Sequence, residues 1–501
     1  MPEAHTDEHW RKLIFQTVPS WLLSLLLHTL LIVVLAMIQL DPIGSVLNVI
    51  QAGSSDSQSD SLEEFSVNAP AAELADAVEV SQPMSQSELS PTLDLAATEP
   101  SMTSLADSSL AEVGMESLTQ SVLPRETLNA NQFASMSQML TSRSTAKKSE
   151  MLEKYGGTAQ SEKSVALALK WLAEHQFKEG PRAGSWNFNH TIVGNRRSSG
   201  AGTHVLASNG ATALALLPFL GAGQTHLEGQ YQDTVRAGMA FLINQMKVTK
   251  HPTLPTGSLH EAQGNMYSHG LASIALCEAY AMTGDPDLQQ PAQLALNFIV
   301  YAQDPRGGGW RYEPKQPGDT SVVGWCLMAL KSGNMGKLQV PVETFVGANN
   351  FLNLVSTNEG VFYGYEQPSG TRRAGTTAIG LLCRMYLGWP REHVSLGKGV
   401  AYLEQQGPKL DDLYYSYYAT QVMRHFGGQP WQNWNSKMRD LLIEAQVKQG
   451  SDAGSWEPVG GHSKEGGRLY QTALATMILE VYYRHLPIYG EQSLGGEDFE
   501  L

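Results

Sequence analysis

A unit of two helical segments joined by a Gly-rich loop recurs six times between about residue 148 and residue 488. The first segment usually ends at or near Gln, and the loop usually carries an aromatic residue. The clearest copies contain SVALALKWLAEHQ, LALNFIVYAQ and MRDLLIEAQ, followed by GSWNF, GGGWRY and GSW. A single helix pair cannot bury its own apolar surface, so a repeat of roughly 45 to 70 residues indicates units that stack and share a core.

The two helices of each unit differ in where their apolar residues fall. In the first helix of the sixth unit, Trp434, Met438 and Leu442 recur at helical spacing, and charged residues take the positions between them. Second helices such as LASIALCEAYAM are apolar or small nearly all round, as expected of helices surrounded by protein. We therefore predict an all-α fold, an (α/α)6 toroid of six inner and six outer helices over residues 148–488. An open solenoid is the alternative, but it would leave the inner layer facing water.

An apolar segment near the N-terminus predicts a membrane anchor. Ser20 to Leu40 is apolar over roughly 20 residues, the length that crosses a bilayer as a helix. Arg11 and Lys12 precede this segment and Asp41 follows it, so the positive-inside rule places the N-terminus in the cytoplasm. We predict a cytoplasmic N-terminus (1–17), a transmembrane helix (18–40) in contact with the lipid bilayer, and an extracytoplasmic toroid, periplasmic in a bacterium. A cleaved signal peptide is the competing interpretation.

The segment after the predicted anchor carries most of the negative charge. The chain has a net charge of -15, and residues 41–124 contain 14 acidic residues and no Lys or Arg. With few aromatic residues, this stretch cannot offset its ordering entropy, so we predict a disordered acidic linker over 41–147 and an acidic tail over 489–501. No basic stripe is present that would replace phosphate counterions, which argues against nucleic-acid binding.

The repeat resembles a known family. The segments KWLAEHQ…GSW and IEAQVKQGSDAGSW are similar to the QW repeat of squalene and hopene cyclases, and the resemblance extends over about residues 156–486 to the squalene-cyclase and protein-prenyltransferase repeat family. In that family the Gln and Trp tie a helix end to the next loop. The resemblance therefore implies structural clasps at Gln176 with Trp186, Gln303 with Trp310, and Gln449 with Trp456.

The reactive motifs of the family are not intact in this chain. The cyclases protonate an alkene with a DxDD motif, and the matching segment here is Gln316-Pro317-Gly318-Asp319, which keeps only the last Asp. The prenyltransferases hold zinc with an Asp-x-Cys pair and a distant His. Here Asp319 and Cys326 lack that spacing, and Tyr415 stands where the His is expected. We predict no metal site and no cofactor, and whether the protein is an enzyme stays open.

Two residues are candidate catalytic groups. Asp319 begins an inner helix, where it would act as an N-cap with a lowered pKa or, in a dry aromatic cavity, as an acid with a raised pKa. His269, in MYSHG, would serve as an acid, a base or a ligand, or else as a hydrogen-bonded core residue.

Inner-helix N-termini that converge at one end of a ring attract anions. Arginines precede several of these helices and predict an anion-binding mouth: Arg196, Arg197, Arg311, Arg372, Arg373 and Arg468. Ordinary solvated loop arginines are the alternative. Aromatic residues early in the inner helices would line a cavity for an isoprenoid chain, or would simply form core: Tyr267, Trp325, Tyr414, Tyr415, Tyr417, Tyr418 and Tyr470.

The sequence is compatible with three functions. The first is a membrane-anchored toroid that binds an isoprenoid or another anionic amphipathic ligand in a central cavity. The second is a non-catalytic scaffold at the cell envelope. The third is a polysaccharide lyase or hydrolase, because α/α toroids also host those activities.

Overall fold

The computed structural model describes residues 143, 145–194, 196–250, 254–485 and 488. The predicted cytoplasmic N-terminus, membrane span and acidic tail, and nearly all of the predicted linker, lie outside the described residues. Among the residues that are described, no helix is both long enough and apolar enough to cross a bilayer.

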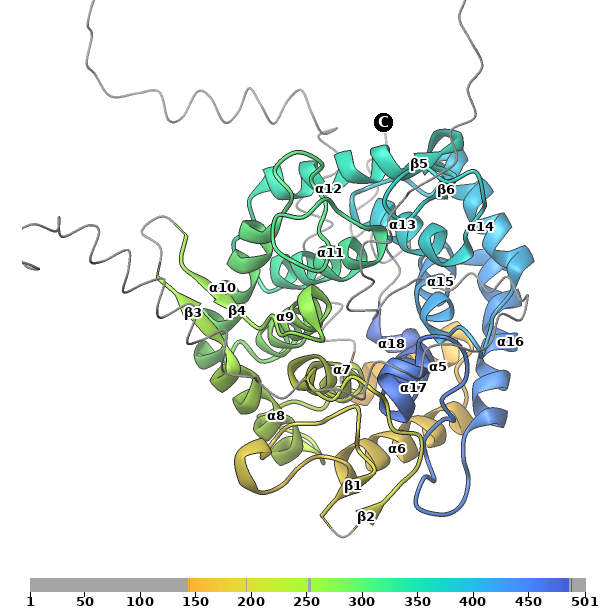
Figure 1. The fold of residues 1–501 in the computed structure, drawn as a ribbon. Helices are drawn as coiled ribbons and strands as arrows, with labels where there is room; N and C mark the ends of the chain where they lie inside the picture. Colours follow the sequence, from red (N-terminus) through yellow and green to blue (C-terminus); the bar gives the residue numbers. More distant parts are fainter. Residues whose placement is uncertain (1–142, 144, 195, 251–253, 486–487, 489–501) are drawn as a thin grey trace, which may run out of the picture. The chain divides into compact units, whose positions relative to one another are not determined.

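Twelve of the described helices form six outer/inner pairs (Figure 1). In chain order the pairs are α6 (Ala159–Glu174) with α7 (Ser208–Gly221), α8 (Gln232–Gln245) with α9 (Asn265–Thr283), α10 (Pro286–Ala302) with α11 (Thr320–Met335), α12 (Val342–Val355) with α13 (Ala374–Tyr386), α14 (Val394–Gln406) with α15 (Leu413–Phe426), and α16 (Gly428–Ala445) with α17 (Ser463–Leu479).

The inner helices close into a ring. Each of α7, α9, α11, α13 and α15 packs against the next inner helix, and α17 packs back against α7, as the view down the ring in Figure 1 shows. Outer helices lie over the grooves between inner ones; α10, for example, contacts both α9 and α11, and α6 contacts both α17 and α7. The predicted (α/α)6 toroid is therefore confirmed, and the open solenoid is excluded.

Burial follows the predicted difference between the two helix types. Every residue of α7 from Asn209 to Gly221 is buried, whereas α16 buries only the stripe Trp431, Trp434, Asn435, Met438 and Leu442. Small residues let the inner helices approach closely. At Gly324 an added Cβ would lie 2.7 Å from the Ile379 side chain of α13, so a larger residue would push α11 and α13 apart.

The ring also contains elements that the repeat does not predict. Three antiparallel hairpins project from loops between outer and inner helices: β1 (Ile192–Val193) with β2 (Arg196–Arg197), β3 (Lys247–Thr249) with β4 (Thr256–Ser258), and β5 (Ser356–Thr357) with β6 (Phe362–Tyr363). Helices α5 (Thr145–Tyr155) and α18 (Val481–Arg484) flank the twelve and pack against each other.

Three glutamines act as clasps between outer helices. The Gln176 side-chain amide donates to Gly184 O at 2.9 Å and to Thr234 O of α8 at 2.9 Å. The Gln303 amide donates in the same way to Gly308 O and to Thr344 O of α12. The indole N–H groups of the paired tryptophans donate to the preceding outer helix at 2.7 to 2.8 Å: Trp186 to Leu172 O, Trp310 to Ile299 O, and Trp456 to Leu442 O.

The third clasp corrects the sequence prediction. Gln446, not Gln449, donates to Gly454 O at 2.9 Å and to Ser164 O of α6 at 2.8 Å, and it forms a bridge with Trp456. Gln446 is the C-cap of α16, which brings its amide to the helix end, whereas Gln449 is exposed in the loop beyond. This clasp joins the last outer helix to the first one.

The two ends of the repeat are also joined by buried charges. The Arg468 side chain of α17 is 1% exposed; it donates to Ser199 O at 2.9 Å and pairs with Glu457 at 2.5 Å. At the opposite ends of the inner helices, Arg143 and Arg484 both contact the Glu278 carboxylate, at 2.8 and 3.1 Å.

Candidate functional site

The N-termini of the inner helices lie at one end of the ring, which we call the mouth. Met266 N, at the start of α9, donates to Tyr312 O at 3.1 Å, and Thr320 N, at the start of α11, donates to Tyr365 O at 2.9 Å. Each helix start is thus bonded to the loop of the following repeat. This arrangement holds the loops before α9, α11 and α13 side by side at the mouth.

Asp319 is the N-cap of α11. Its Oδ1 accepts from Val322 N at 2.9 Å, as the sequence predicted for a capping residue. The Ser321 hydroxyl also donates to Oδ1, at 2.6 Å. The Tyr267 hydroxyl lies 2.5 Å from Ser321 Oγ and donates to it, because the Ser321 proton is already given to Asp319. A relay of hydroxyl groups therefore runs from α9 to this carboxyl.

The second oxygen of Asp319 is different. Asp319 is fully buried, and among the described residues its Oδ2 has no hydrogen-bond partner. The nearest cation is Arg311, whose Nε lies 4.0 Å from Oδ2. Burial raises the pKa of Asp319 to about 6, against the opposing effects of the Ser321 and Val322 hydrogen bonds and the Arg311 charge. This carboxyl thus exchanges protons near neutral pH.

Arg311 connects this buried carboxyl to solvent. Its side chain is 31% exposed, and its Nη2 lies 2.6 Å from Glu366 Oε1. Two phenols complete the surroundings: the hydroxyls of Tyr312 and Tyr365 are 2.6 Å apart, and the Tyr312 ring lies 6.1 Å from the Tyr267 ring. We call the set the Asp319 cluster; it consists of Tyr267, Arg311, Tyr312, Asp319, Ser321, Tyr365 and Glu366.

The sequence analysis did not identify four members of this cluster, although the repeat carries a signal for two of them, Tyr312 and Tyr365. The other two are Ser321 and Glu366. Trp310-Arg311-Tyr312-Glu313 and Tyr363-Gly364-Tyr365-Glu366 occupy matching places in successive repeats, and each ends in Tyr-Glu. Aligning the loops by the end of the outer helix would have placed Tyr312 and Tyr365 at the same level of the mouth. Asp319, Tyr267 and Arg311 are the predicted residues that the structure brings together here.

His269 lies outside the Asp319 cluster and is held by the main chain. Leu259 N donates to its Nδ1 at 3.1 Å, and its Nε2 donates to Ala295 O at 3.0 Å. Burial lowers the pKa of His269 to about 3, so the ring is neutral at ordinary pH. These contacts are those of a hydrogen-bonded core histidine, so His269 is not part of the Asp319 cluster.

The predicted aromatic residues fall into different places. The Trp325 ring, on α11, stacks on Tyr417 at 5.5 Å and meets Tyr418 edge-on at 5.5 Å and Tyr414 at 6.1 Å, all on α15. These four buried side chains join α11 to α15, the two inner helices that pack on either side of α13. Tyr415 instead faces the outer helix α16 and donates to Gly407 O at 3.0 Å, and Tyr470 is buried on α17.

The predicted arginines do not form one anion-binding set. Arg468 is buried in the contacts that join the last repeat to the first, which leaves it no exposed face for a ligand. Arg373 is half-buried at the start of α13, and Arg372 is exposed in a groove outside the ring. Arg311 is the arginine that faces Asp319 at the mouth.

The mouth also carries exposed apolar residues. Leu206, just before α7, is 63% exposed, and its N–H donates to Gln263 Oε1 in the loop before α9. Val205 and Val459 are 41% and 43% exposed at the same end. Within the described part of the chain, no group of three or more His, Cys, Asp or Glu residues is arranged to hold a metal ion.

The sequence matches no protein-family model and no curated protein. Among solved structures, the chain is similar to α/α toroid proteins of different activities. A family 76 α-1,6-mannanase from Salegentibacter sp. superposes with a TM-score of 0.44 at 10% identity, over 64% of this chain and 98% of that one. Cellobiose 2-epimerase from Bacillus thermoamylovorans gives 0.46 at 14% identity, over 65% and 98%.

A type II terpene cyclase from Scytonema, in complex with geranylgeranyl dihydroxybenzoate, gives a TM-score of 0.40 at 15% identity, over 65% of this chain and 97% of that one. The cyclase and the glycan-active proteins are thus similar to this chain to a comparable degree. The assignment of the toroid itself rests on the contacts between its own helices.

Proposed function

We propose that this protein is a membrane-anchored toroid that binds an isoprenoid or another amphipathic ligand at its mouth. The polar head group of the ligand would contact Arg311 and Asp319, and its apolar part would cover Val205 and Leu206. The observation that carries the proposal is the buried Asp319 Oδ2, which has no hydrogen-bond partner among the described residues and lies beside a partly exposed Arg311. A buried carboxylate oxygen needs a hydrogen-bond donor, and at Asp319 a ligand beside the partly exposed Arg311 would supply it.

The pKa of Asp319 bears on the reaction that the site would support. A carboxyl with a pKa of about 6 holds a proton in part of the molecules near neutral pH, which suits general acid–base transfer to or from an oxygen of the ligand. Protonation of an alkene requires a much stronger acid, and the raised pKa argues against it. Any turnover would therefore take place at the polar head group.

The polysaccharide lyase or hydrolase interpretation remains the second candidate because of one observation. Arg311 lies between two carboxylates, Asp319 on its buried side and Glu366 on its exposed side. Glycoside hydrolysis uses two carboxyl groups on opposite sides of the scissile bond. Release of reducing sugar from an oligosaccharide, lost in both D319N and E366Q, would favour this candidate over the first.

The test of the main proposal uses the full chain in lipid nanodiscs. Farnesyl diphosphate and its neutral alcohol, farnesol, are added separately, and the thermal midpoint of unfolding is recorded. A ligand at 100 times its Kd stabilises the folded state by about 2.7 kcal/mol. We expect a higher midpoint with the diphosphate, and we expect Arg311→Gln to remove its advantage over the alcohol.

Asp412→Asn is the matched control for Asp319→Asn, since both aspartates cap inner helices and Asn caps equally well. We expect D319N to change ligand binding and D412N to leave it unchanged. An unchanged midpoint with both compounds, together with no lipid extracted from the purified protein, would overturn the proposal and favour the envelope scaffold.

A further inference from the structure

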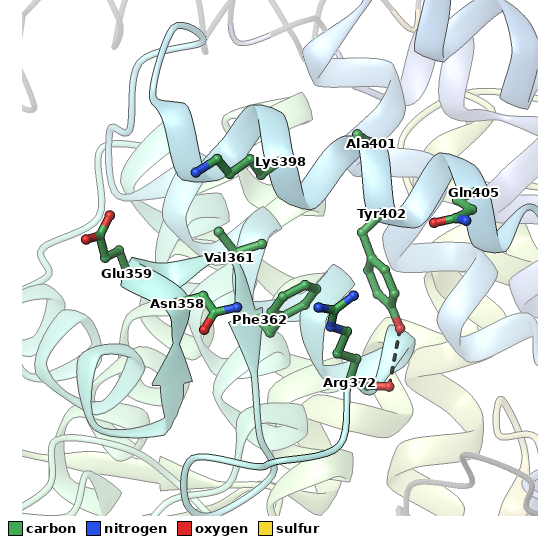
Figure 2. Close-up of a pocket in the computed structure, with 9 residues that line it drawn as sticks. All are labelled: Asn358, Glu359, Val361, Phe362, Arg372, Lys398, Ala401, Tyr402 and Gln405. Carbon is green, nitrogen blue, oxygen red and sulfur yellow. Dashed lines mark hydrogen bonds between the residues drawn. The ribbon is translucent and has the colours of Figure 1, made fainter.

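A groove of about 560 Å³ lies outside the ring, between the β5–β6 hairpin and the outer helix α14 (Figure 2). One wall comes from four residues of α14 spaced at i, i+3, i+4 and i+7, which places them on one helix face: Lys398, Ala401, Tyr402 and Gln405. The other wall comes from the hairpin: Asn358, Glu359, Val361 and Phe362. A groove of this volume accommodates a ligand of small-molecule size.

Arg372 is held in place within the groove. Its guanidinium lies 4.7 Å from the centre of the Phe362 ring, and the Tyr402 hydroxyl donates to its main-chain oxygen at 3.3 Å (Figure 2). The Tyr402 and Phe362 rings meet edge to face at 5.1 Å. The aromatic contacts reduce the freedom that the arginine would lose on binding.

The charges of the groove favour an anion. Arg372 and Lys398 are both cationic, and neither is within ion-pair distance of a carboxylate of any described residue. Glu359 is the one acidic side chain in the lining, so the groove keeps a net positive charge. Figure 2 shows Lys398 on α14 and Arg372 on the opposite wall, with Phe362 between them. Arginine pairs well with carboxylates because its guanidinium can donate two parallel hydrogen bonds.

The remaining lining indicates the rest of the ligand. Asn358 and Gln405 are exposed amides that can both donate and accept hydrogen bonds, as hydroxyl groups require. Tyr402 and Val361 add apolar surface beside them. An acidic sugar combines a carboxylate, several hydroxyls and apolar C–H faces. We infer that this groove binds an acidic oligosaccharide of uronate type, with one carboxylate on Arg372 and a carboxylate of another uronate unit on Lys398.

The test uses the full chain in nanodiscs with three probes: trigalacturonate, a neutral trisaccharide of glucose, and inorganic phosphate. Binding is followed by isothermal titration. We expect measurable binding of trigalacturonate and at least about tenfold weaker binding of the neutral sugar, because one good charged contact corresponds to a factor of about ten. Equal affinity for phosphate and trigalacturonate would show that only an anion is recognised and would overturn the saccharide assignment.

Variants locate the site. Arg372→Gln and Lys398→Gln should each weaken trigalacturonate binding about tenfold without changing the unfolding midpoint, because both side chains are exposed. Arg391→Gln is the matched control. Arg391 is also exposed, and its guanidinium lies 5.2 Å from the centre of the Phe426 ring, outside the groove. Full binding of trigalacturonate by R372Q, or an equal loss of binding in R391Q, would overturn the inference. D319N should bind the saccharide normally, because that substitution alters only the mouth.

Discussion

Asp319 combines two roles through its two oxygens. Oδ1 is committed to the helix start through Val322 and Ser321, and Oδ2 is the atom left for a ligand or a proton. The cap interaction and the burial act on the pKa in opposite directions, and burial prevails. A residue in this position stabilises α11 locally while its charge costs free energy in the folded state.

This balance predicts a pH dependence of stability. The pKa of Asp319 is about 6 in the folded protein against 3.8 for an ordinary Asp, so the folded state binds more protons between those values. The stabilisation that comes from protonated Asp319 is therefore fully present below about pH 4 and is lost as the pH rises through 6. Asp319→Asn keeps the cap and removes the charge. We expect D319N to be more stable than the wild type at pH 7, by at most about 3 kcal/mol, and equally stable near pH 3.5.

The check is urea unfolding of both proteins from pH 3.5 to 8, with D412N as the reference for the substitution itself. A constant difference between D319N and the wild type over this range would contradict the raised pKa of Asp319.

At the scale of single residues, the sequence predicts the position of Asp319 better than its surroundings. The capping role followed from its place before an apolar helix, and that part is confirmed. Arg311 lies in the same loop as Asp319, but Tyr267 comes from the start of α9 and Tyr365 from the loop before α13, and their approach to Asp319 depends on how the repeats are rotated about the ring. No local pattern contains that rotation, and none shows that Arg468 is buried between the last and first repeats or that Arg372 lines a groove beside α14.

At the scale of the elements, the separation between Gln and Trp along the loop determines which glutamine forms a clasp. Two glutamines lie in IEAQVKQG, and only Gln446 has the ten-residue separation from its Trp that Gln176 has from Trp186. The resemblance predicted the existence of the clasp, while the distance along the loop determines which Gln reaches two carbonyl groups. The helix pairs were predictable because their periodicity is long, whereas the two- and three-residue strands of the hairpins are too short to leave a pattern.

This assignment gives a matched pair of variants. Gln446→Ala removes two buried hydrogen bonds and leaves the carbonyls of Ser164 and Gly454 without their partner, so we expect a loss of about 1 to 3 kcal/mol in the free energy of unfolding. Gln449→Ala changes an exposed side chain and should stay within about 0.5 kcal/mol of the wild type. Urea unfolding of the intact chain in detergent measures both, and a larger loss for Q449A would contradict the corrected clasp.

At the scale of the whole toroid, the two ends of the ring differ in character. The buried Asp319 carboxyl at the mouth has the partly exposed Arg311 as its nearest cation, whereas at the opposite end the buried carboxylates Glu278 and Glu480 lie 2.8 to 3.7 Å from Arg143 or Arg484. There Arg143 donates to Glu278 and to Leu220 O, and Arg484 donates to Glu278 and to Leu217 O. Burial raises the pKa of Glu278, but the charges of Arg143 and Arg484 outweigh it, so the pKa lies below its ordinary value. Residues from both ends of the described chain thus meet on one inner helix.

Removal of the shared carboxylate should therefore destabilise the closed ring as a whole. Glu278→Gln leaves two buried guanidinium groups, each with a side-chain exposure of 2% or less, without their main counter-charge. We expect a loss of about 3 to 5 kcal/mol, the range measured when one partner of a buried ion pair is removed. Arg236→Gln, which breaks the exposed pair with Asp233, should cost no more than about 1 kcal/mol. Both are measured by urea unfolding of the intact chain, and a loss in E278Q as small as that in R236Q would show that main-chain carbonyls and Glu480 are enough to satisfy Arg143 and Arg484.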